Sequence, residues 1–409
     1  MIESGLAEAF ERLADGLAPV EQSQRIALAH ARGRVLARAL VARHDLPSSD
    51  QAAMDGYAVR VQDLAGGPRS LKVLGRALAG HDFGQRLAPG TCVRIMTGAS
   101  MPEGADCVVL MEVAQELGDD TVALPGPIAP GANRRVRGEH LRAGAQALPA
   151  GRRLRAADLA LACALGEVEL DVFRQLRVAI MSTGDELRDA PADLPPGCAF
   201  DSNRLMLQLA IGQVGLAAHD FGICPDEPEA LQHRIDEAMG EGMDALLISG
   251  GAALGDADIV RMLGGVRFVA VRIRPGRGIA VARVERTDRR LLILGLPGNA
   301  VAAYVMFHSL ALPVLLRLGG ATDARPPEPI AMPIACDVQA RAGRIDFQRA
   351  RLVFDKAGRR VAQPLEQQGS AMIRSVADAH ALIAVGPAGH YRAGELLPVY
   401  PLASFEEAL

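Results

Sequence analysis

From residue 176 to about residue 320 the chain alternates short apolar runs with stretches of helical spacing. The apolar runs are LRVAIM, LAAHDFGI, DALLIS and RRLLILGL, and the helical stretches include SNRLMLQLAIGQVG, EPEALQHRIDEAMG and AVAAYVMFHSLALPVLLRLG. Strands that alternate with helices are the signature of a parallel sheet with helices on its faces. This alternation therefore predicts an α/β domain over residues 176–325.

The rest of the chain shows two other patterns. Residues 5–40 and 154–166 carry apolar residues at spacings compatible with a helix, and Gly166 is placed to act as a C-cap. Two further regions show short apolar runs between Gly and Pro breaks, which is typical of small β domains. We therefore expect an α/β multidomain fold with four parts: an elongated helical linker domain (1–44 and 142–175), an inserted β domain (45–141), the α/β domain (176–325) and a C-terminal β domain (326–409).

Composition restricts the partners of this 409-residue chain. A formal net charge of -4, 3% aromatic residues and no Trp argue against binding of nucleic acid through a basic surface or aromatic stacking. The N-terminus lacks a basic-then-apolar signal pattern, and we expect no apolar stretch near the roughly 18–20 residues of a membrane span. The six cysteines never form CxxC, so neither a zinc site nor a disulfide framework is indicated. A cytoplasmic protein without membrane or nucleic-acid partners is expected.

Three loops that lead from a predicted strand towards a helix are rich in Ser, Thr and Gly: STGDEL (182–187), SGGAALGDAD (249–258) and LPGNA (296–300). Ligands of open parallel sheets gather at the carboxyl ends of the strands, where free N–H groups at helix starts bind phosphate or other oxyanions. The segment RPGRG (274–278) adds two arginines with forked donors that suit an anion. Each loop alone could be ordinary turn chemistry, but together they predict an oxyanion site.

Acidic residues lie in the same loops, and Asp201 opens the next predicted helix. Capping is the alternative function of an acid near a helix start, and it stays open for Asp185 and Asp201. Carboxylates beside an anion repel it unless a hard cation bridges them, so these acids predict Mg²⁺ bound together with phosphate. For AMDGYAV (53–59) the simplest interpretation is a tight turn, because an Asp-Gly pair supplies positive φ values.

Nine motifs carry a family resemblance that covers nearly the whole chain. They are AMDGYAV, RIMTGASMPEGADCVVLME, VRGEHLRAGA, STGDEL, DSNRLML, SGGAALGDADIV, RPGRGIAVAR, LPGNAVAAYV and GRIDFQRARL, in this order. The chain resembles the bacterial molybdopterin molybdenumtransferases, the molybdenum insertases related to the C-terminal part of gephyrin. The resemblance implies a transferase that inserts molybdate into adenylylated molybdopterin with release of AMP and with Mg²⁺ as the bound metal, the last step of molybdenum cofactor biosynthesis. The α/β domain would be the molybdopterin-binding domain.

The resemblance also implies a homodimer and a set of site residues. In the family the AMDGY loop of one chain reaches the α/β cleft of the other, and for this chain we expect transfer of the cofactor to molybdoenzymes or other cofactor-biosynthesis proteins. The implied catalytic residues are Asp55, Asp185, Glu186 and Asp258, and the implied metal ligands are Asp201, Asp256 and Asp258. The implied substrate-binding residues are Thr97, Gly98, Thr183, Gly184, Ser249, Gly250, Gly251, Arg274, Arg277, Pro297, Gly298, Asn299 and Arg344.

The chain departs from the family pattern at several positions. Ala253, Ala300 and Ala302 stand where the family commonly has Ser or Pro, so two hydroxyl donors are missing near the expected oxyanion and weaker molybdate binding is predicted. A non-catalytic molybdopterin-binding or scaffold protein is therefore one alternative. A molybdopterin adenylyltransferase is another, because the α/β domain alone would resemble that enzyme, although the AMDGY and GRIDF segments belong to domains that such an enzyme lacks.

Overall fold

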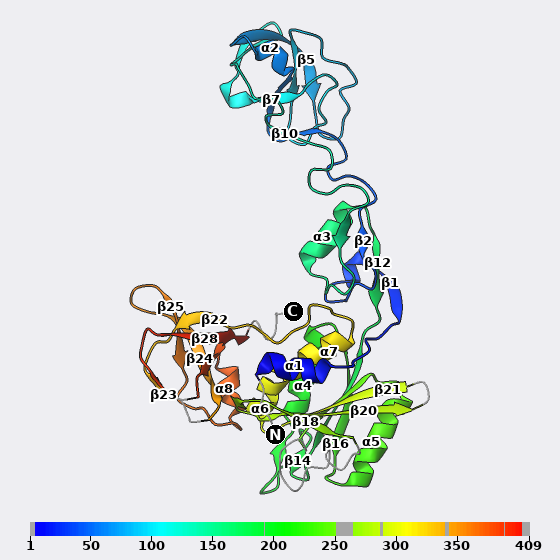
Figure 1. The fold of residues 1–409 in the computed structure, drawn as a ribbon, viewed down its shortest axis with the longest axis vertical. Helices are drawn as coiled ribbons and strands as arrows, with labels where there is room; N and C mark the ends of the chain where they lie inside the picture. The colour runs from blue at the N-terminus through cyan, green and yellow to red at the C-terminus, as the bar shows by residue number, and fades with distance from the viewer. Residues whose placement is uncertain are drawn as a thin grey trace. The chain divides into compact units, whose positions relative to one another are not determined.

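The computed structural model describes residues 5–191, 193–250, 265–286, 289–339, 343–387 and 389–402. The chain divides into two compact units (Figure 1). The larger unit consists of Met1–Arg38, Ala150–Leu159 and Glu169–Leu409, and the smaller unit of Ala39–Pro149 and Ala160–Val168. Both units are discontinuous in sequence, since the smaller one is inserted into the N-terminal part of the larger one.

A six-stranded sheet forms the centre of the larger unit. Its strands are β13 (Arg177–Thr183), β16 (Ala217–Cys224), β17 (Ala245–Ser249), β18 (Arg267–Ala270), β20 (Gly278–Arg286) and β21 (Arg289–Leu296), in the order β16-β13-β17-β21-β20-β18. β13 is parallel to β16 and β17, and β17 is parallel to β21, whereas β20 and β18 are antiparallel additions. The predicted parallel sheet is confirmed, with an antiparallel extension beyond β21.

Helices cover both faces of this sheet, as Figure 1 shows. On β13, Val178 and Ile180 belong to one buried cluster, and Ala179 and Met181 belong to another, because successive side chains of a strand point to opposite faces. The first cluster is completed by α1 (Leu6–Ala14), α4 (Asn203–Gln213), α6 (Ala300–Met306) and α7 (Leu312–Leu318), and the second by α5 (Pro228–Gly240). Strands buried on both faces explain why their sequences are continuously apolar.

The run Ala300–Leu318 is one continuous helix in which a π-helical segment, Phe307–Ala311, joins α6 to α7. By length and composition this helix is apolar enough to cross a membrane, but 94% of its apolar window is buried inside the structure. Our sequence-based expectation that no apolar stretch approaches such a length is wrong for this helix. Its burial against α1 and the sheet makes it the core helix of the larger unit.

The predicted helix over residues 5–40 is confirmed only for α1. Residues Ser23–Ala27 form a strand, β1, that pairs antiparallel with β12 (Glu169–Phe173), and a 3-10 turn follows at Leu28–His30. Apolar spacing alone cannot separate a short strand from a helix, and here a partner strand far away in the sequence binds the backbone groups. The linker that we expected to be helical is therefore partly β structure.

The second predicted linker helix is confirmed as α3 (Ala156–Ala164). Gly166 has a φ of 81° and donates its N–H to Cys163 O, and Glu167 donates its N–H to Ala162 O. These two bonds form a Schellman motif, which requires a left-handed residue and so favours Gly. The predicted C-cap is confirmed at this residue.

A second sheet of the larger unit contains a strand from the RPGRG region. Its strands are β19 (Ile273–Arg274), β22 (Ile330–Pro333), β24 (Ile345–Phe354), β25 (Arg360–Pro364), β26 (Ala381–Val385) and β28 (Leu396–Pro401), and the short elements β23 (Val338–Gln339), β27 (His390–Tyr391) and α8 (Ile373–Ala377) lie between them in sequence. β19 pairs parallel with β24, with Arg274 opposite Asp346. The β structure expected near the C-terminus is confirmed, and its sheet is continued by residues from the α/β region.

The smaller unit is a β structure, as the sequence predicted. A six-stranded sheet of order β7-β4-β6-β5-β9-β8 is formed by β4 (Gly56–Val59), β5 (Arg69–Ala77), β6 (Thr91–Ile95), β7 (Cys107–Leu110), β8 (Gln115–Gly118) and β9 (Thr121–Leu124). Two short pairs accompany it, β2 (Leu40–Val41) with β11 (Gln146–Leu148) and β3 (Gln51–Ala52) with β10 (Arg134–Arg135). Tyr57, Val59 and Leu71 lie in its buried core.

Candidate functional site

The carboxyl ends of three parallel strands lie side by side in the larger unit. Ser182 of β13 pairs in register with Ser249 of β17, which pairs with Leu296 of β21. Asn203, at the start of α4, donates from Nδ2 to Ser249 Oγ at 2.8 Å and to Gly298 O at 2.7 Å. This amide therefore joins two of the predicted oxyanion loops. We did not assign Asn203 a role from sequence, although the DSNR motif contains it.

Thr183 and Gly250 lie against each other at this edge. Gly250 has a φ of 97°, and a Cβ atom at this position would lie 2.5 Å from Thr183 O and 2.8 Å from Thr183 Oγ1. Thr183 is 6% exposed, and its Oγ1 has no hydrogen-bond partner among the described residues. A buried hydroxyl without a partner is costly, so a ligand oxygen at this position would satisfy it.

The loop after β13 carries acidic groups close together. At Gly184 the φ of 149° is one that residues with a side chain rarely adopt, so the loop favours Gly there; a Cβ atom would also lie 2.5 Å from Glu186 Oε2, at the end of a flexible side chain. Asp226 donates its backbone N–H to Asp185 Oδ1 at 3.3 Å. Burial, and then the charge of Asp185, raises the pKa of Asp226. Within the described ranges no cationic side chain forms an ion pair with Asp185 or Glu186, so this loop has uncompensated negative charge.

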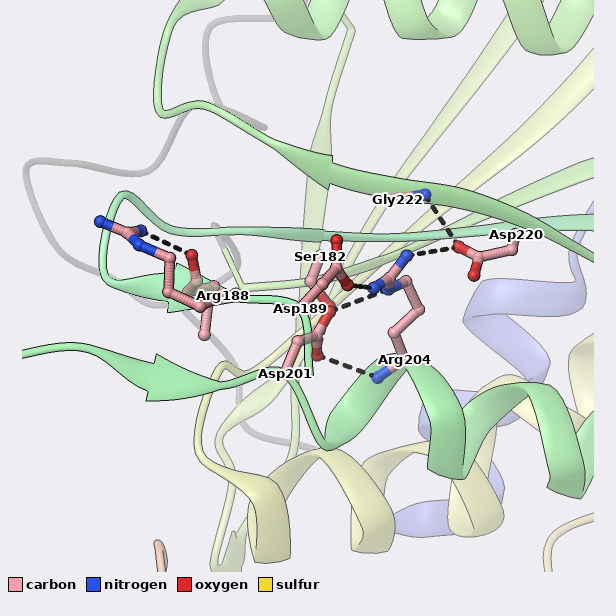
Figure 2. Close-up of polar contacts among 8 residues, drawn as sticks. Ser182, Arg188, Asp189, Asp201, Arg204, Asp220 and Gly222 are labelled. Atoms are coloured by element: carbon pink, nitrogen blue, oxygen red, sulfur yellow. Dashed lines mark hydrogen bonds and ion pairs between the residues drawn. The ribbon is translucent and has the colours of Figure 1, made fainter. Parts of the chain in front are cut away.

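Asp201 has a different environment, shown in Figure 2. Its side chain is 2% exposed, and Oδ1 accepts from Ser182 Oγ at 3.0 Å and from the Arg204 backbone N–H at 3.2 Å. Oδ2 accepts from Arg204 Nε at 3.0 Å. Asp201 thus stabilises the first turn of α4 and is ion-paired with Arg204, which is the structural alternative that the sequence left open. Its role as a metal ligand stays a prediction, and a cation would compete with Arg204 there.

A cavity of about 780 Å³ lies between the α/β part and the C-terminal sheet of the larger unit. It gathers five of the predicted substrate-binding residues: Arg274, Arg277, Pro297, Asn299 and Arg344. The other lining residues are Phe268, Pro275, Gly276, Gly278, Ala302, Asp346, Gln368, Gly369 and Ser370. The lining contains three arginines and one buried carboxylate, that of Asp346, so its formal charge is positive and favours an anion.

The RPGRG loop needs its glycines for close packing. A Cβ atom at Gly276 (φ 97°) would lie 2.9 Å from Met306 Cγ, and one at Gly278 (φ 148°) would lie 2.1 Å from Val269 O. Val271 donates its N–H to Arg277 O at 2.8 Å, which closes the loop. The loop is thereby packed closely against the core helix and β18, and its two arginines lie on this packed segment.

Sequence reasoning missed one wall of this cavity, residues 368–370. Gln368 donates from Nε2 to Arg349 O at 3.0 Å and to Leu365 O at 2.7 Å, and its Oε1 accepts from the Arg349 N–H at 2.9 Å. Ser370 O accepts from the Val301 N–H at 3.1 Å. The only sequence signal was the Gly-Ser pair of GSAMIRS, which does not indicate that this loop packs on the start of α6.

Asp55 belongs to the smaller unit and is exposed. Its Oδ1 accepts two hydrogen bonds of 2.7 Å, from the hydroxyl and from the backbone N–H of Thr97. These bonds, the hydroxyl first, lower the pKa of Asp55. Oδ2 has no hydrogen-bond partner in the described part of the chain. Gly98 (φ 79°) donates its N–H to Ala52 O at 2.9 Å and so continues the same turn.

The tight-turn interpretation of the Asp-Gly pair is wrong. Neither Asp55 nor Gly56 has a positive φ, and Gly56 is the first residue of β4. A Cβ atom at Gly56 would lie 2.0 Å from Val109 O on β7. Glycine is therefore required by the close approach of a neighbouring strand, and not by turn geometry.

Three predicted site residues, Gly251, Asp256 and Asp258, lie outside the described residues, as does Ala253. Within the described residues no group of three or more His, Cys, Asp or Glu side chains is placed to hold a metal ion. The structure therefore does not assemble the predicted metal ligands within its described part.

Family models match the chain in three consecutive regions. The MoeA N-terminal region (domain I and II) matches residues 5–166, a probable molybdopterin binding domain matches residues 179–317, and the MoeA C-terminal region (domain IV) matches residues 331–402. The order of these matches follows the order of the motifs along the sequence.

Curated and solved relatives agree with these models. A molybdopterin molybdenumtransferase of Haemophilus influenzae is 31% identical over 97% of this chain and 98% of its own length. One from a Nostoc species is 39% identical over 71% of this chain and 68% of its own length. The crystal structure of a molybdopterin biosynthesis moeA protein from Pyrococcus horikoshii superposes with a TM-score of 0.79 at 25% identity, covering 98% of this chain and 100% of the other.

Proposed function

This chain belongs to the family of molybdopterin molybdenumtransferases, and we infer that it is a transferase that inserts molybdenum into molybdopterin in molybdenum cofactor biosynthesis. The observation that supports a binding site for this reaction is the cavity of about 780 Å³ with Arg274, Arg277 and Arg344 in its wall. Molybdate is an oxyanion, and guanidinium groups bind oxyanions through charge-assisted hydrogen bonds.

We propose that the substrate is adenylylated molybdopterin and that AMP is released. The arginines of the cavity hold molybdate, together with the Asn299 amide. At the strand edge the Thr183 hydroxyl and the backbone beside Gly250 hold the phosphate groups, since this hydroxyl is buried without a partner among the described residues. Asn203 keeps the two loops at a fixed distance. Most of what phosphoryl chemistry requires from a protein is positioning and charge neutralisation, which these residues provide.

Mg²⁺ is part of the proposal. Asp185 and Glu186 fit it, because their charges are not neutralised within the described part of the chain and Mg²⁺ prefers one or two carboxylates together with substrate phosphates. Asp256 and Asp258 would complete its ligands. When bound, Mg²⁺ would polarise the phosphoanhydride as a Lewis acid. The described residues by themselves bind and orient the substrates and balance the charge of the anions.

A homodimer and a cytoplasmic location are also proposed, together with transfer of the cofactor to molybdoenzymes or other cofactor-biosynthesis proteins. Asp55, with Thr97 and Gly98, would act from one protomer on the site of its partner. Light scattering is expected to give the mass of a dimer at micromolar concentration, and a monomer at that concentration would contradict this arrangement.

The test of the function is AMP release from adenylylated molybdopterin across a molybdate titration, measured together with cofactor formation. Saturable, molybdate-dependent release supports the insertase. Ligand binding without release would support the scaffold alternative. Consumption of ATP with unmodified molybdopterin would support the adenylyltransferase.

Two substitutions connect this test to the cavity. Arg277→Ala is expected to raise the half-saturating molybdate concentration by about 10- to 100-fold, because a hydrogen bond from a charged group contributes about 1.5–3 kcal/mol. Arg290→Ala is the matched control, since Arg290 is 70% exposed on β21 and pairs only with Glu285 in the described chain. Ala302 lines the cavity, so Ala302→Ser should lower the half-saturating concentration. Equal effects of the two arginine substitutions would contradict the assignment of the cavity.

A further inference from the structure

Arg204 binds three carboxylates that come from three separate segments (Figure 2). Its Nε donates to Asp201 Oδ2 at 3.0 Å, its Nη1 donates to Asp220 Oδ1 at 2.7 Å, and its Nη2 pairs with Asp189. The Arg204 side chain is only 12% exposed. One positive guanidinium therefore bridges three carboxylates whose negative charges would otherwise repel one another, and the cluster as a whole stays net negative.

One of the three carboxylates belongs to the loop that carries the proposed catalytic acids. Residues 185–189, which we call the acidic arm, begin at Asp185 and end at Asp189. Within the arm, β14 (Leu187–Arg188) pairs parallel with β15 (Ala199–Phe200), and Arg188 donates to Asp185 O at 2.8 Å. The arm is thus a folded segment whose far end is bound to Arg204.

The second carboxylate connects Arg204 to the sheet. Asp201 accepts a hydrogen bond of 3.0 Å from Ser182 of β13, which lies in register with Ser249 of β17. The third carboxylate, Asp220, belongs to the edge strand β16 and also accepts the Gly222 N–H at 2.8 Å. Arg204 therefore joins the acidic arm to the strand edge where the proposed phosphate site lies.

We propose that Arg204 is a positioning residue, which holds the acidic arm against the strand edge so that Asp185 and Glu186 are correctly placed for the reaction. This inference rests on the proposed function. A planar guanidinium has donors that point towards three partners in three directions. The ammonium group of a lysine is a compact point charge and does not offer this geometry. Some residues do not bind a metal themselves but orient a residue that does. Removing such a residue typically lowers metal affinity or activity by about 10- to 100-fold.

Two aspartates provide a matched pair of substitutions. Asp189→Asn weakens the contact between Arg204 and the acidic arm, and Asp220→Asn weakens the contact between Arg204 and the edge strand. Their side chains are 64% and 46% exposed, so both substitutions should leave the thermal midpoint nearly unchanged. Only Asp189→Asn weakens a contact made by the arm itself. A comparison of the two variants therefore separates positioning of the arm from general support of the fold.

The experiment measures three quantities for the wild type, Asp189→Asn, Asp220→Asn and Arg204→Lys. They are kcat for AMP release, the half-saturating Mg²⁺ concentration, and amide hydrogen exchange of residues 184–189. We expect Asp189→Asn and Arg204→Lys to lower kcat or raise the Mg²⁺ requirement by about tenfold and to speed exchange in the arm. Asp220→Asn is expected to match the wild type in all three quantities.

The positioning role would be overturned by an unchanged Asp189→Asn variant, or by equal losses in Asp189→Asn and Asp220→Asn. Faster exchange in the arm without a change in kcat or in the Mg²⁺ requirement would also overturn it, because the arm would then be held for stability alone. A wild type that releases no AMP would overturn the proposed function itself, so the two failures are distinguishable.

Discussion

Asp55 and Asp201 are both aspartates that the sequence nominated for the site, and they lie in opposite environments. Asp55 is exposed in the smaller unit, and among the described residues its carboxylate accepts hydrogen bonds only from the neutral groups of Thr97. Asp201 is buried in the larger unit and is ion-paired with Arg204. Neutral donors orient a carboxylate without cancelling its charge, whereas a guanidinium cancels it. The charge of Asp55 is therefore available to a ligand, and the charge of Asp201 is already used by the fold.

The largest expected effect concerns the strand that begins beside Asp55. Gly56→Ala would place a Cβ atom 2.0 Å from Val109 O, so we expect the free energy of unfolding of the smaller unit to fall by about 3 kcal/mol, the upper end for overpacking. Gly66→Ala is the control, because no atom lies within 4 Å of a Cβ atom there. Calorimetry of both variants would measure this, and equal midpoints would show that β4 can move away from β7.

The second prediction is about catalysis at Asp55. Asp55→Asn retains an oxygen that can accept both Thr97 hydrogen bonds, so the fold should be unchanged while the negative charge is lost. We expect AMP release to slow by about 100-fold or more, as for loss of a catalytic acid or base. Asp82→Asn, on an exposed loop of the same unit, should have wild-type turnover. Wild-type turnover of Asp55→Asn would make its charge irrelevant.

The third prediction is about stability at Asp201. Asp201→Ala removes the acceptor of Ser182 and one of the three carboxylates around Arg204, and we expect a loss of about 2 kcal/mol in the free energy of unfolding of the larger unit. The cost stays below that of an isolated buried pair because Arg204 keeps Asp189 and Asp220. Denaturant unfolding would measure it against Asp220→Ala, which should cost less. If Asp201→Ala is as stable as the wild type but its AMP release no longer depends on Mg²⁺, the metal-ligand role is favoured instead.

The smallest predicted effect is on the ionisation of Asp55. The Thr97 hydroxyl and N–H lower its pKa, so its stabilising contribution is present above its unfolded pKa of about 3.9 and is lost as the pH falls through the lower folded value. Thr97→Val removes the hydroxyl, and the pKa of Asp55 should rise towards its ordinary value. Carbon NMR titration of the carboxyl would show the shift, and Thr121→Val should show none. If the pKa of Asp55 is unchanged in Thr97→Val, the backbone N–H of residue 97 alone is enough to lower it.

The parallel sheet and the approximate positions of its loops could be predicted, because strands buried on both faces are continuous apolar runs that residue order alone reveals. Contacts between segments that lie far apart in the sequence could not be predicted. Ser23–Ala27 forms a strand because its backbone pairs with Glu169–Phe173. Position 56 requires glycine because Val109 O lies so close to it. Both were misinterpreted from local spacing.

The candidate site likewise has residues that the sequence could nominate and contacts that it could not predict. Arg274, Arg277 and Arg344 could be nominated from their motifs, but their common cavity depends on the pairing of β19 with β24. Residues 368–370 complete its wall through bonds to Arg349 and Val301, which no local pattern encodes. For Asp201 the sequence left capping and metal binding open, and the described contacts are those of capping and of the ion pair with Arg204.

The packing of α1 against α7 has a consequence for how the chain is made. The Phe10 ring lies 5.6 Å from the Arg317 guanidinium, and Phe10 and Leu13 share one core with Leu312 and Leu315. A ribosome that adds about 5–20 residues per second needs roughly 15–60 s to pass from the first of these segments to the second. During that interval the apolar face of α1 has no native partner on α7. α1 therefore completes its packing only after α7 has been made, and until then its apolar face on the nascent chain is open to binding by a chaperone.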